Sequence, residues 1–167
     1  MKLGRWIKHR WLDEGDSRRL LDDAALARLQ ARVRASELRH HGEIRICVEA
    51  GLPLSYLWQK RSARERALTL FGKLRVWDTE ANNGVLIYLL LADHAIEIVA
   101  DRGLSRHVPQ SQWAEVVADL SDAIHAGRCE TGLAQAVDRV DALLVEHFAL
   151  APGQINPNEL PDHVHRI

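Results

Sequence analysis

Four side chains with hard oxygen atoms in the middle of this sequence are candidate ligands of a cation. Three lie in a short acidic and amide-rich stretch, and the fourth follows about twenty residues later: Asp78, Glu80, Asn83 and Asp101. Carboxylate and amide oxygens suit Ca²⁺ and Mg²⁺, and Ca²⁺ holds its oxygens at about 2.3–2.6 Å. If the two segments meet in the fold, these residues form a divalent-cation site.

The same stretch also has the composition of an ordinary turn. Asn82 and Asn83 tolerate left-handed backbone, and Gly84 adopts it without steric cost. Three such residues before an apolar run therefore also suit a plain connection into a strand.

Phosphate-ester hydrolysis is a further chemical possibility for these residues. Asp78 or Asp101 would act as the nucleophile, with Arg102 or a bound metal stabilising the charge of the transition state. Neighbouring carboxylates and arginines also form structural ion pairs, so the cation site, the hydrolytic site and the turn all stay open.

Hydrophobic periodicity places the stretch beside a pair of strands. Residues 84–92 are continuously apolar, which is typical of a strand buried on both faces, and residues 95–101 alternate. Another strand is expected at 43–50, with apolar residues on one face. Its other face is expected to be wetter and carries Arg45, Cys47 and Glu49.

Apolar residues at helical spacing predict helices at 17–38, 62–74, 109–127 and 131–147. Ser17 and Ser62 are expected to cap the first two, and Gly127 to end the third. Residues 151–167 contain three prolines and few large apolar residues, so we expect a poorly ordered or surface-lying tail.

This order of elements predicts an α/β fold: a single-domain, three-layer sandwich with a small mixed sheet and helices on both faces. The expected parts are a basic, tryptophan-containing segment at 1–16, the folded domain at 17–149 and a proline-containing tail at 150–167. A chain of 167 residues can bury roughly 70% of the surface that it exposes when unfolded.

Composition excludes several classes of protein. The two cysteines have neither disulfide nor metal spacing, and the longest apolar run is far shorter than the ~20 residues of a membrane helix. With no secretory signal pattern, a soluble and cytoplasmic protein is the expectation. A net charge of −1 and a pI near 6.8 argue against nucleic acid as a partner.

Charge is distributed unevenly along the chain. Residues 1–75 contain 17 Lys/Arg and 9 Asp/Glu, and residues 76–167 contain 5 and 14, so the halves carry +8 and −9. We expect the two halves to attract each other within one fold, although the same asymmetry can also steer partners.

The N-terminal sequence is basic and amphipathic. Residues 1–12 interleave four Lys/Arg with Trp6, Trp11 and other apolar residues, so as a helix this segment could lie on the anionic inner face of a membrane. The alternative is that both tryptophans pack on the domain.

From Leu20 to Phe148, the chain resembles the TPM domain family, which includes a thylakoid-lumen acid phosphatase, a photosystem II repair protein and a modulator of nematode acetylcholine receptors. Its most specific match is residues 82–89, Asn-Asn-Gly-Val-Leu-Ile-Tyr-Leu, where the family reads approximately Asp-Asn-Gly-Val-Leu-Leu-Leu-Val. The pair Gly103-Leu104 follows, and the preceding helix ends Leu70-Phe71 at the family's spacing.

The resemblance implies a Rossmann-like α/β sandwich without a nucleotide fingerprint, and weak acid phosphatase activity or divalent-cation binding near the loop in some members. It also implies a membrane-protein partner. This chain departs from the family at Asn82, which replaces an aspartate, and at Arg75, Trp77 and the pair Asp101-Arg102. We also expect neither the signal peptide nor the C-terminal membrane helix that are common in the family.

Two functions are therefore expected. The first is a non-enzymatic interaction module for a protein or membrane-associated partner. The alternative is a divalent-cation-dependent acid phosphatase with weak or altered activity. Partner, oligomeric state and strand order do not follow from the sequence.

Overall fold

Four strands form one open sheet in the order β3-β2-β1-β4. In the computed structural model, which describes residue 9 and residues 14–167, β1 (Ile44–Glu49) is the second strand from one edge. It pairs in parallel with β2 (Val85–Leu90) and with β4 (His165–Arg166), while β2 pairs antiparallel with β3 (Ala95–Ala100). The predicted mixed sheet is confirmed.

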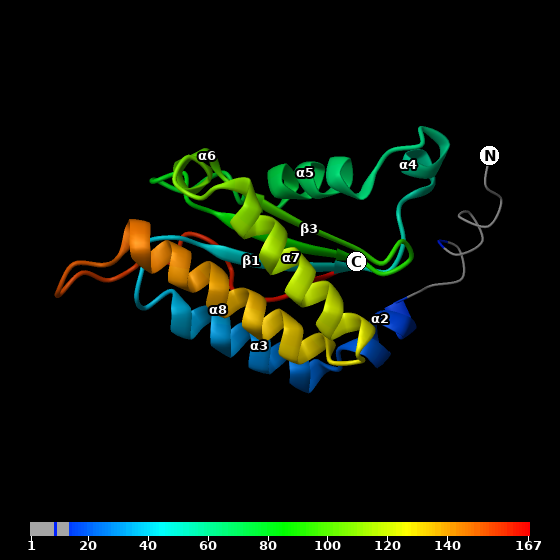
Figure 1. Cartoon of the computed structure of the whole chain (residues 1–167), viewed down its shortest axis with the longest axis horizontal. Coiled ribbons are helices and arrows are strands. Elements are labelled where there is room, and N and C mark those ends of the chain that lie inside the picture. Colours follow the sequence, from blue (N-terminus) through cyan, green and yellow to red (C-terminus); the bar gives the residue numbers. More distant parts are fainter. Residues whose placement is uncertain (1–8, 10–13) are drawn as a thin grey trace.

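Helices cover both faces of this sheet, as Figure 1 shows. One face packs against the long helices α3, α7 and α8, and the other against α4 and α5. The helices are α2 (Glu14–Leu20), α3 (Asp23–Ser36), α4 (Leu54–Trp58), α5 (Ala63–Lys73), α6 (Arg102–Ser105), α7 (Gln110–His125) and α8 (Cys129–Phe148). The three-layer α/β sandwich predicted from the sequence is confirmed.

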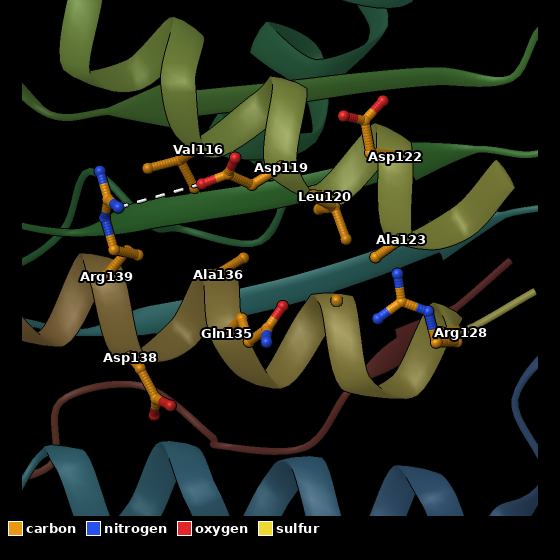
Figure 2. A pocket seen from close by; sticks show the side chains of 11 residues that line it. Val116, Asp119, Leu120, Asp122, Ala123, Arg128, Gln135, Ala136, Asp138 and Arg139 are labelled. Carbon is orange, nitrogen blue, oxygen red and sulfur yellow. Dashed lines mark ion pairs between the residues drawn. The ribbon is translucent and has the colours of Figure 1, made fainter. Parts of the chain in front are cut away.

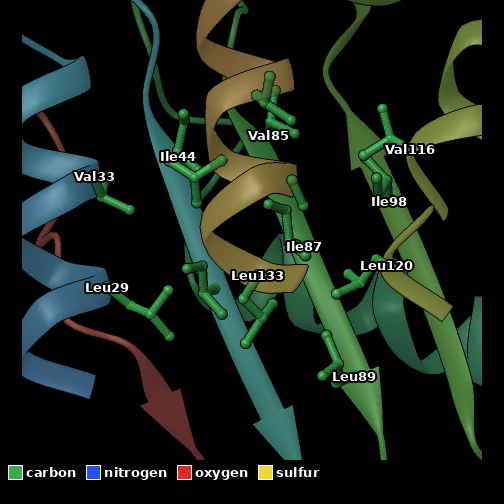
Figure 3. Close-up of a cluster of buried hydrophobic side chains, with 14 of the residues drawn as sticks. Leu29, Val33, Ile44, Val85, Ile87, Leu89, Ile98, Val116, Leu120 and Leu133 are labelled. Carbon is green, nitrogen blue, oxygen red and sulfur yellow. The ribbon is translucent and has the colours of Figure 1, made fainter. Parts of the chain in front are cut away.

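The larger hydrophobic core lies between the sheet and α3, α7 and α8. Figure 3 shows side chains of β1 and β2, such as Ile44 and Ile87, meeting Leu29 of α3, Leu120 of α7 and Leu133 of α8. All five side chains are almost completely buried. Because both faces of β2 are covered, its sequence is a continuous apolar run, as expected for a central strand.

Local capping signals fix the helix starts. Ser62 begins α5 in a capping box with Glu65, as the sequence predicts. The prediction of one helix capped at Ser17 is wrong: the chain breaks after α2, and the Asp22 carboxylate accepts the Ala25 N–H at 2.7 Å to begin α3. Aspartate is as effective an N-cap as serine, so Asp22 can begin a separate helix after Ser17.

The face of β1 that we expected to be wetter is buried. Arg45, Cys47 and Glu49 are at most 3% exposed, because α5 and the C-terminal residues cover them. The expected surface tail is also wrong for its last residues, since β4 extends the sheet. Ile167 donates its N–H to Val48 and accepts the N–H of Ala50.

Ion pairs join the basic first half of the chain to the acidic second half. Arginines of α3 and the turn after it pair with acids of α8 or of the C-terminal segment: Arg28–Glu130, Arg32–Asp138, Arg34–Asp162 and Arg39–Asp141. The uneven charge therefore acts within the fold, as expected.

Two further expectations concern sulfur and membranes. Cys47 and Cys129, which lack disulfide spacing in the sequence, are free and buried. Among the residues that the structure describes, none of the helices has the length and apolar character needed to cross a bilayer. The basic segment 1–12, apart from His9, lies outside the described residues.

Candidate functional site

The predicted oxygen-rich loop lies at the end of the sheet where β1 and β2 begin. Asn83 and Gly84 lead into β2, while Asp101 follows β3, and the Asp101 N–H donates to the Gly84 carbonyl at 2.9 Å. The antiparallel pairing of β2 and β3 thus brings the two segments together. Ligands in open α/β sheets usually bind beyond the carboxyl ends of parallel strands, and this loop lies at the amino ends.

Two of the predicted ligands lie on the surface of the loop. Asp78 is exposed and pairs with Arg75, whose Nη2 lies 2.6 Å from a carboxylate oxygen. Glu80 is also exposed, and its backbone N–H donates to the Glu159 carboxylate at 3.1 Å. A neighbouring guanidinium at Asp78 competes with any cation for that carboxylate.

The other two predicted ligands are held more deeply. Asn83 is fully buried, and neither polar atom of its side-chain amide has a hydrogen-bond partner among the described residues. Asp101 caps the short α6 by accepting the Arg102 N–H at 2.6 Å, and its second carboxylate oxygen is buried without a partner in the described part of the chain. Unpaired buried oxygens of this kind carry a desolvation cost that a bound ion or water would relieve.

Close packing accounts for the glycines of the motif. A Cβ atom on Gly84 would meet the Val76 carbonyl oxygen at 2.0 Å, and one on Gly103 would meet the Asn82 carbonyl oxygen at 2.4 Å. Asn82 has a positive φ of 52°, and its side-chain oxygen accepts a hydrogen bond from Arg102. The motif residues thus serve the turn, which is one of the three interpretations that the sequence leaves open.

A metal centre needs several ligands in one place. Within residue 9 and residues 14–167, no three His, Cys, Asp or Glu side chains form a group that could hold a metal ion. The set of Asp78, Glu80, Asn83 and Asp101 therefore stays a prediction. Asn83 is not one of those four residue types, and its side chain would add an amide oxygen to the set.

A buried polar network lies under α5, at the end of β1. Arg66 donates to both carboxylate oxygens of Glu49, with Nη2–Oε1 at 2.6 Å, and the Tyr88 hydroxyl donates to Glu49 Oε2 at 2.6 Å. The Arg66 guanidinium also lies 5.2 Å from the centre of the Tyr56 ring. Every charge in this network has a partner, which is the pattern of a structural ion pair.

A second buried polar cluster, which the sequence analysis missed, lies near the start of β1. Burial raises the pKa of Glu37 to about 9, with Glu43 adding to the shift, and burial raises the pKa of Glu43 to about 7. Arg45 lies close enough to interact with both, and its Nε and Nη1 have no hydrogen-bond partner among the described residues. Asp162 of the C-terminal segment completes the cluster and pairs with Arg34.

The signal for this cluster was the polar alternation in 43–50, which we interpreted as solvent contact. Glu43 Oε1 accepts the backbone N–H of Glu159 at 3.0 Å, and Glu37 Oε1 accepts that of Ile44 at 3.1 Å. The cluster therefore fastens the C-terminal segment over β1. It lines none of the three grooves described next, so we assign it to the fold.

A shallow groove runs between α7 and α8. Its cavity volume is about 440 Å³, with small apolar side chains such as Ala123 and Ala136 at the bottom (Figure 2). Charged residues line the rim, where Arg139 lies 3.9 Å from Asp119. Three carboxylates and two guanidiniums line the groove, so it has no single charge that would select a ligand.

Two further grooves are lined in part by residues of β3, the edge strand of the sheet. One, of about 390 Å³, is mostly apolar and lies between the β2–β3 turn and the end of α7. The other, of about 290 Å³, lies between Arg64 of α5 and the first half of α7. Both are lined by Ile96, and between them they are lined by β3 residues 95–98. We call this surface the β3-edge groove.

The backbone of β3 offers hydrogen-bonding groups to this groove. The bond from Asp101 to Gly84 fixes which β3 residues face β2, so Ile96, Ile98 and Ala100 direct their N–H and C=O groups outward. The Ile98 carbonyl accepts a hydrogen bond from the Arg64 side chain at 2.6 Å. An outward carbonyl of this strand can therefore be reached by an external donor.

Comparison with known proteins agrees with this architecture. The TPM domain is the family whose pattern matches residues 15–143. A solved structure with the same fold is the NMR structure of the BA42 protein from the psychrophilic bacterium Bizionia argentinensis, with a TM-score of 0.76 and 23% identity over 88% of this chain and 95% of that one. No curated protein shows significant sequence similarity. Because the family match covers most of its length, the chain belongs to the TPM domain family.

Proposed function

We propose that this TPM domain is a non-enzymatic interaction module, and that it binds an extended segment of a partner protein along the edge of β3. The observation that carries the proposal is the β3-edge groove, where an edge strand with outward backbone groups contributes residues to two cavities that are both lined by Ile96. A partner strand added there would extend the sheet by main-chain hydrogen bonds.

The groove also defines the sequence that the partner should have. Side chains alternate between the two faces of an added strand. On one face they would meet apolar residues of α7 such as Ala114 and Val117, and on the other they would lie beside Arg64 of α5. An extended peptide with apolar residues at every second position fits this arrangement. A membrane-associated protein that carries such a segment outside the bilayer would serve as the partner.

Arg64 is the residue that a partner must displace. Its guanidinium donates to the Ile98 carbonyl and lies 3.5 Å from the Glu97 carboxylate. Side chains that occupy or charge an exposed edge keep sheets from pairing without control. In this proposal Arg64 protects the strand when the partner is absent.

Selection from random peptides tests the proposal, because it requires no identified partner. A displayed library is selected on the immobilised full chain, and the recovered peptides are bound to the wild type and to Ala100→Pro. The N–H that proline removes at this position points outward and not towards β2, so the sheet keeps its own hydrogen bonds while binding should weaken at least about ten-fold. Ala100→Ser keeps the N–H and is the matched control. Peptides that bind all three proteins equally would contradict the proposal.

A second candidate function is divalent-cation binding at the loop, with phosphomonoester hydrolysis depending on it. The buried oxygens of Asn83 and Asp101, which lack partners among the described residues, favour it. Titration with Ca²⁺ or Mg²⁺, followed by amide NMR, should then shift residues 77–84 and 101–104. Hydrolysis that disappears in Asp78→Ala or Asp101→Ala would establish the enzyme, and the absence of saturable shifts would remove this candidate.

A further inference from the structure

Helix α4 presents two large apolar side chains to solvent. Leu54 is 55% exposed and Trp58 is 77% exposed, and their spacing of four residues places them on one face of the helix. The opposite side is anchored, because Leu57 and Leu52 are buried in the core under α5. The buried side of α4 therefore fixes the orientation of its exposed face.

Positively charged residues follow this apolar face directly in the sequence. The segment 52–64 contains Lys60, Arg61 and Arg64 and no acidic residue. The Arg61 side chain is held in place, with Nε 2.7 Å from the Gln59 side-chain oxygen and the guanidinium 5.3 Å from the centre of the Tyr56 ring. We call Leu54, Trp58, Lys60 and Arg61 the α4 tip.

The acidic residues that flank this segment in the sequence are engaged elsewhere. Glu65 accepts the Ser62 N–H at 2.7 Å in the capping box, and Glu49 is buried against Arg66. Both carboxylates therefore have their own hydrogen-bond donors. The α4 tip combines exposed apolar surface with positive charge.

His9, the one described residue among the first thirteen, lies at the base of the same tip. His9 is buried, its Nδ1 accepts the Leu52 N–H at 2.9 Å, and its Nε2 lies 3.0 Å from the Asp93 carboxylate. Leu52 is directly followed by Pro53, the residue that begins α4.

We propose that the α4 tip binds an anionic lipid surface. Tryptophan and leucine insert into the boundary between headgroups and acyl chains, while lysine and arginine bind lipid phosphates above it. An exposed apolar tip can insert into a bilayer without a pocket. Binding of a protein partner usually relies on an anchor side chain that fills a pocket, and such a pocket would be expected near the tip. None of the three grooves described above includes Leu54 or Trp58.

This site is separate from the β3-edge groove and goes beyond the proposed function. The α4 tip follows the carboxyl end of β1, and no residue of the tip lines the β3-edge groove. Lipid contact would place the domain next to a membrane-associated partner, but either activity can exist without the other. Their tests are therefore independent.

Vesicle sedimentation tests the lipid site. The full chain is mixed with phosphatidylcholine vesicles with and without phosphatidylglycerol, and binding is expected only with the anionic lipid. Trp58→Ser should weaken binding about ten-fold, and Lys60→Gln about five-fold. Trp77→Ser is the matched control, because Trp77 is also an exposed tryptophan, at 51%, in the loop before β2. The control should bind like the wild type.

Three results would overturn the lipid site. The first is equal binding to vesicles with and without phosphatidylglycerol, and the second is equal loss in Trp58→Ser and Trp77→Ser. The third is binding by Trp58→Ser and Lys60→Gln that matches the wild type, which would assign lipid binding to the N-terminal sequence instead. Thermal unfolding of each variant shows that it is folded, so a loss of binding reports on the tip itself.

Discussion

The two edges of the sheet differ in what covers them. At the β4 edge the chain's own C-terminal segment lies beside β1, held by the Arg34–Asp162 pair and by the hydrogen bond from Arg166 to the Leu21 carbonyl. At the β3 edge, an arginine side chain reaches one outward carbonyl. The chain's own C-terminal strand therefore covers β1 at one edge of the sheet, whereas the other edge keeps a groove along β3.

Removing the cover from the closed edge should have the largest effect. A chain that ends at Asn158 loses the buried Leu160 and strand β4, and it exposes the buried Arg45 face of β1. We expect the free energy of unfolding to fall by about 3–5 kcal/mol, measured by chemical denaturation.

The matched control for this truncation is Ile155→Ser. Ile155 belongs to the same segment but is 84% exposed, so its replacement should change stability by less than about 0.5 kcal/mol. A truncated chain as stable as the wild type would mean that the C-terminal segment does not close the edge.

Glu43 holds the C-terminal segment at the closed edge, so its titration should make the stability that this edge contributes depend on pH. Burial raises its pKa to about 7 in the folded protein, against an ordinary 4.5. Between these pH values the native state binds more protons than the unfolded state, so stability falls as pH rises through this range. Glu43→Gln should remove the part of that loss that Glu43 contributes, while Glu37 keeps its own, and the variant should be more stable than the wild type above pH 7 by about 3 kcal/mol at most.

Chemical denaturation of both proteins at several pH values measures this difference. Glu146→Gln, at an exposed position of α8, is the control and should keep the pH dependence of the wild type. Parallel stability curves for Glu43→Gln and the wild type would contradict a buried, titrating Glu43.

A substitution at the open edge should change the free energy of unfolding only slightly but should change peptide affinity clearly. Arg64→Ala removes an exposed arginine, so we expect less than about 1 kcal/mol of destabilisation. It also frees the Ile98 carbonyl, and selected peptides should bind about five-fold more tightly. Arg139→Ala, which removes a surface arginine of α8, is the control. Tighter binding in neither variant would show that Arg64 does not protect the edge.

The sequence predicts the elements well where a local signal decides them. The continuous run in β2, the alternation in β3 and the capping box at Ser62 all specify their elements through neighbours in the chain. Family resemblance through the 82–89 motif added the fold, and the structure explains its glycine by the close approach of Val76 to Gly84.

Contacts between distant segments account for what the sequence does not predict. Polar residues at alternate positions of β1 resemble a solvent face until residues near 160 and α5 cover them, and β4 is two residues long, too short for any periodicity. The candidate loop was partly predictable. Its meeting with Asp101 follows from the hairpin, but the Arg75–Asp78 pair and the burial of Asn83 depend on side-chain geometry.

Amide hydrogen exchange at β3, with and without a selected peptide, tests the central claim most directly. Ile96, Ile98 and Ala100 donate no N–H to β2, so their amides should exchange quickly in the free protein. Saturation with peptide should slow these amides, while Glu97 and Val99, already bonded to β2, change little. Unchanged exchange at Ile96, Ile98 and Ala100 under saturating peptide would contradict strand addition at the β3-edge groove.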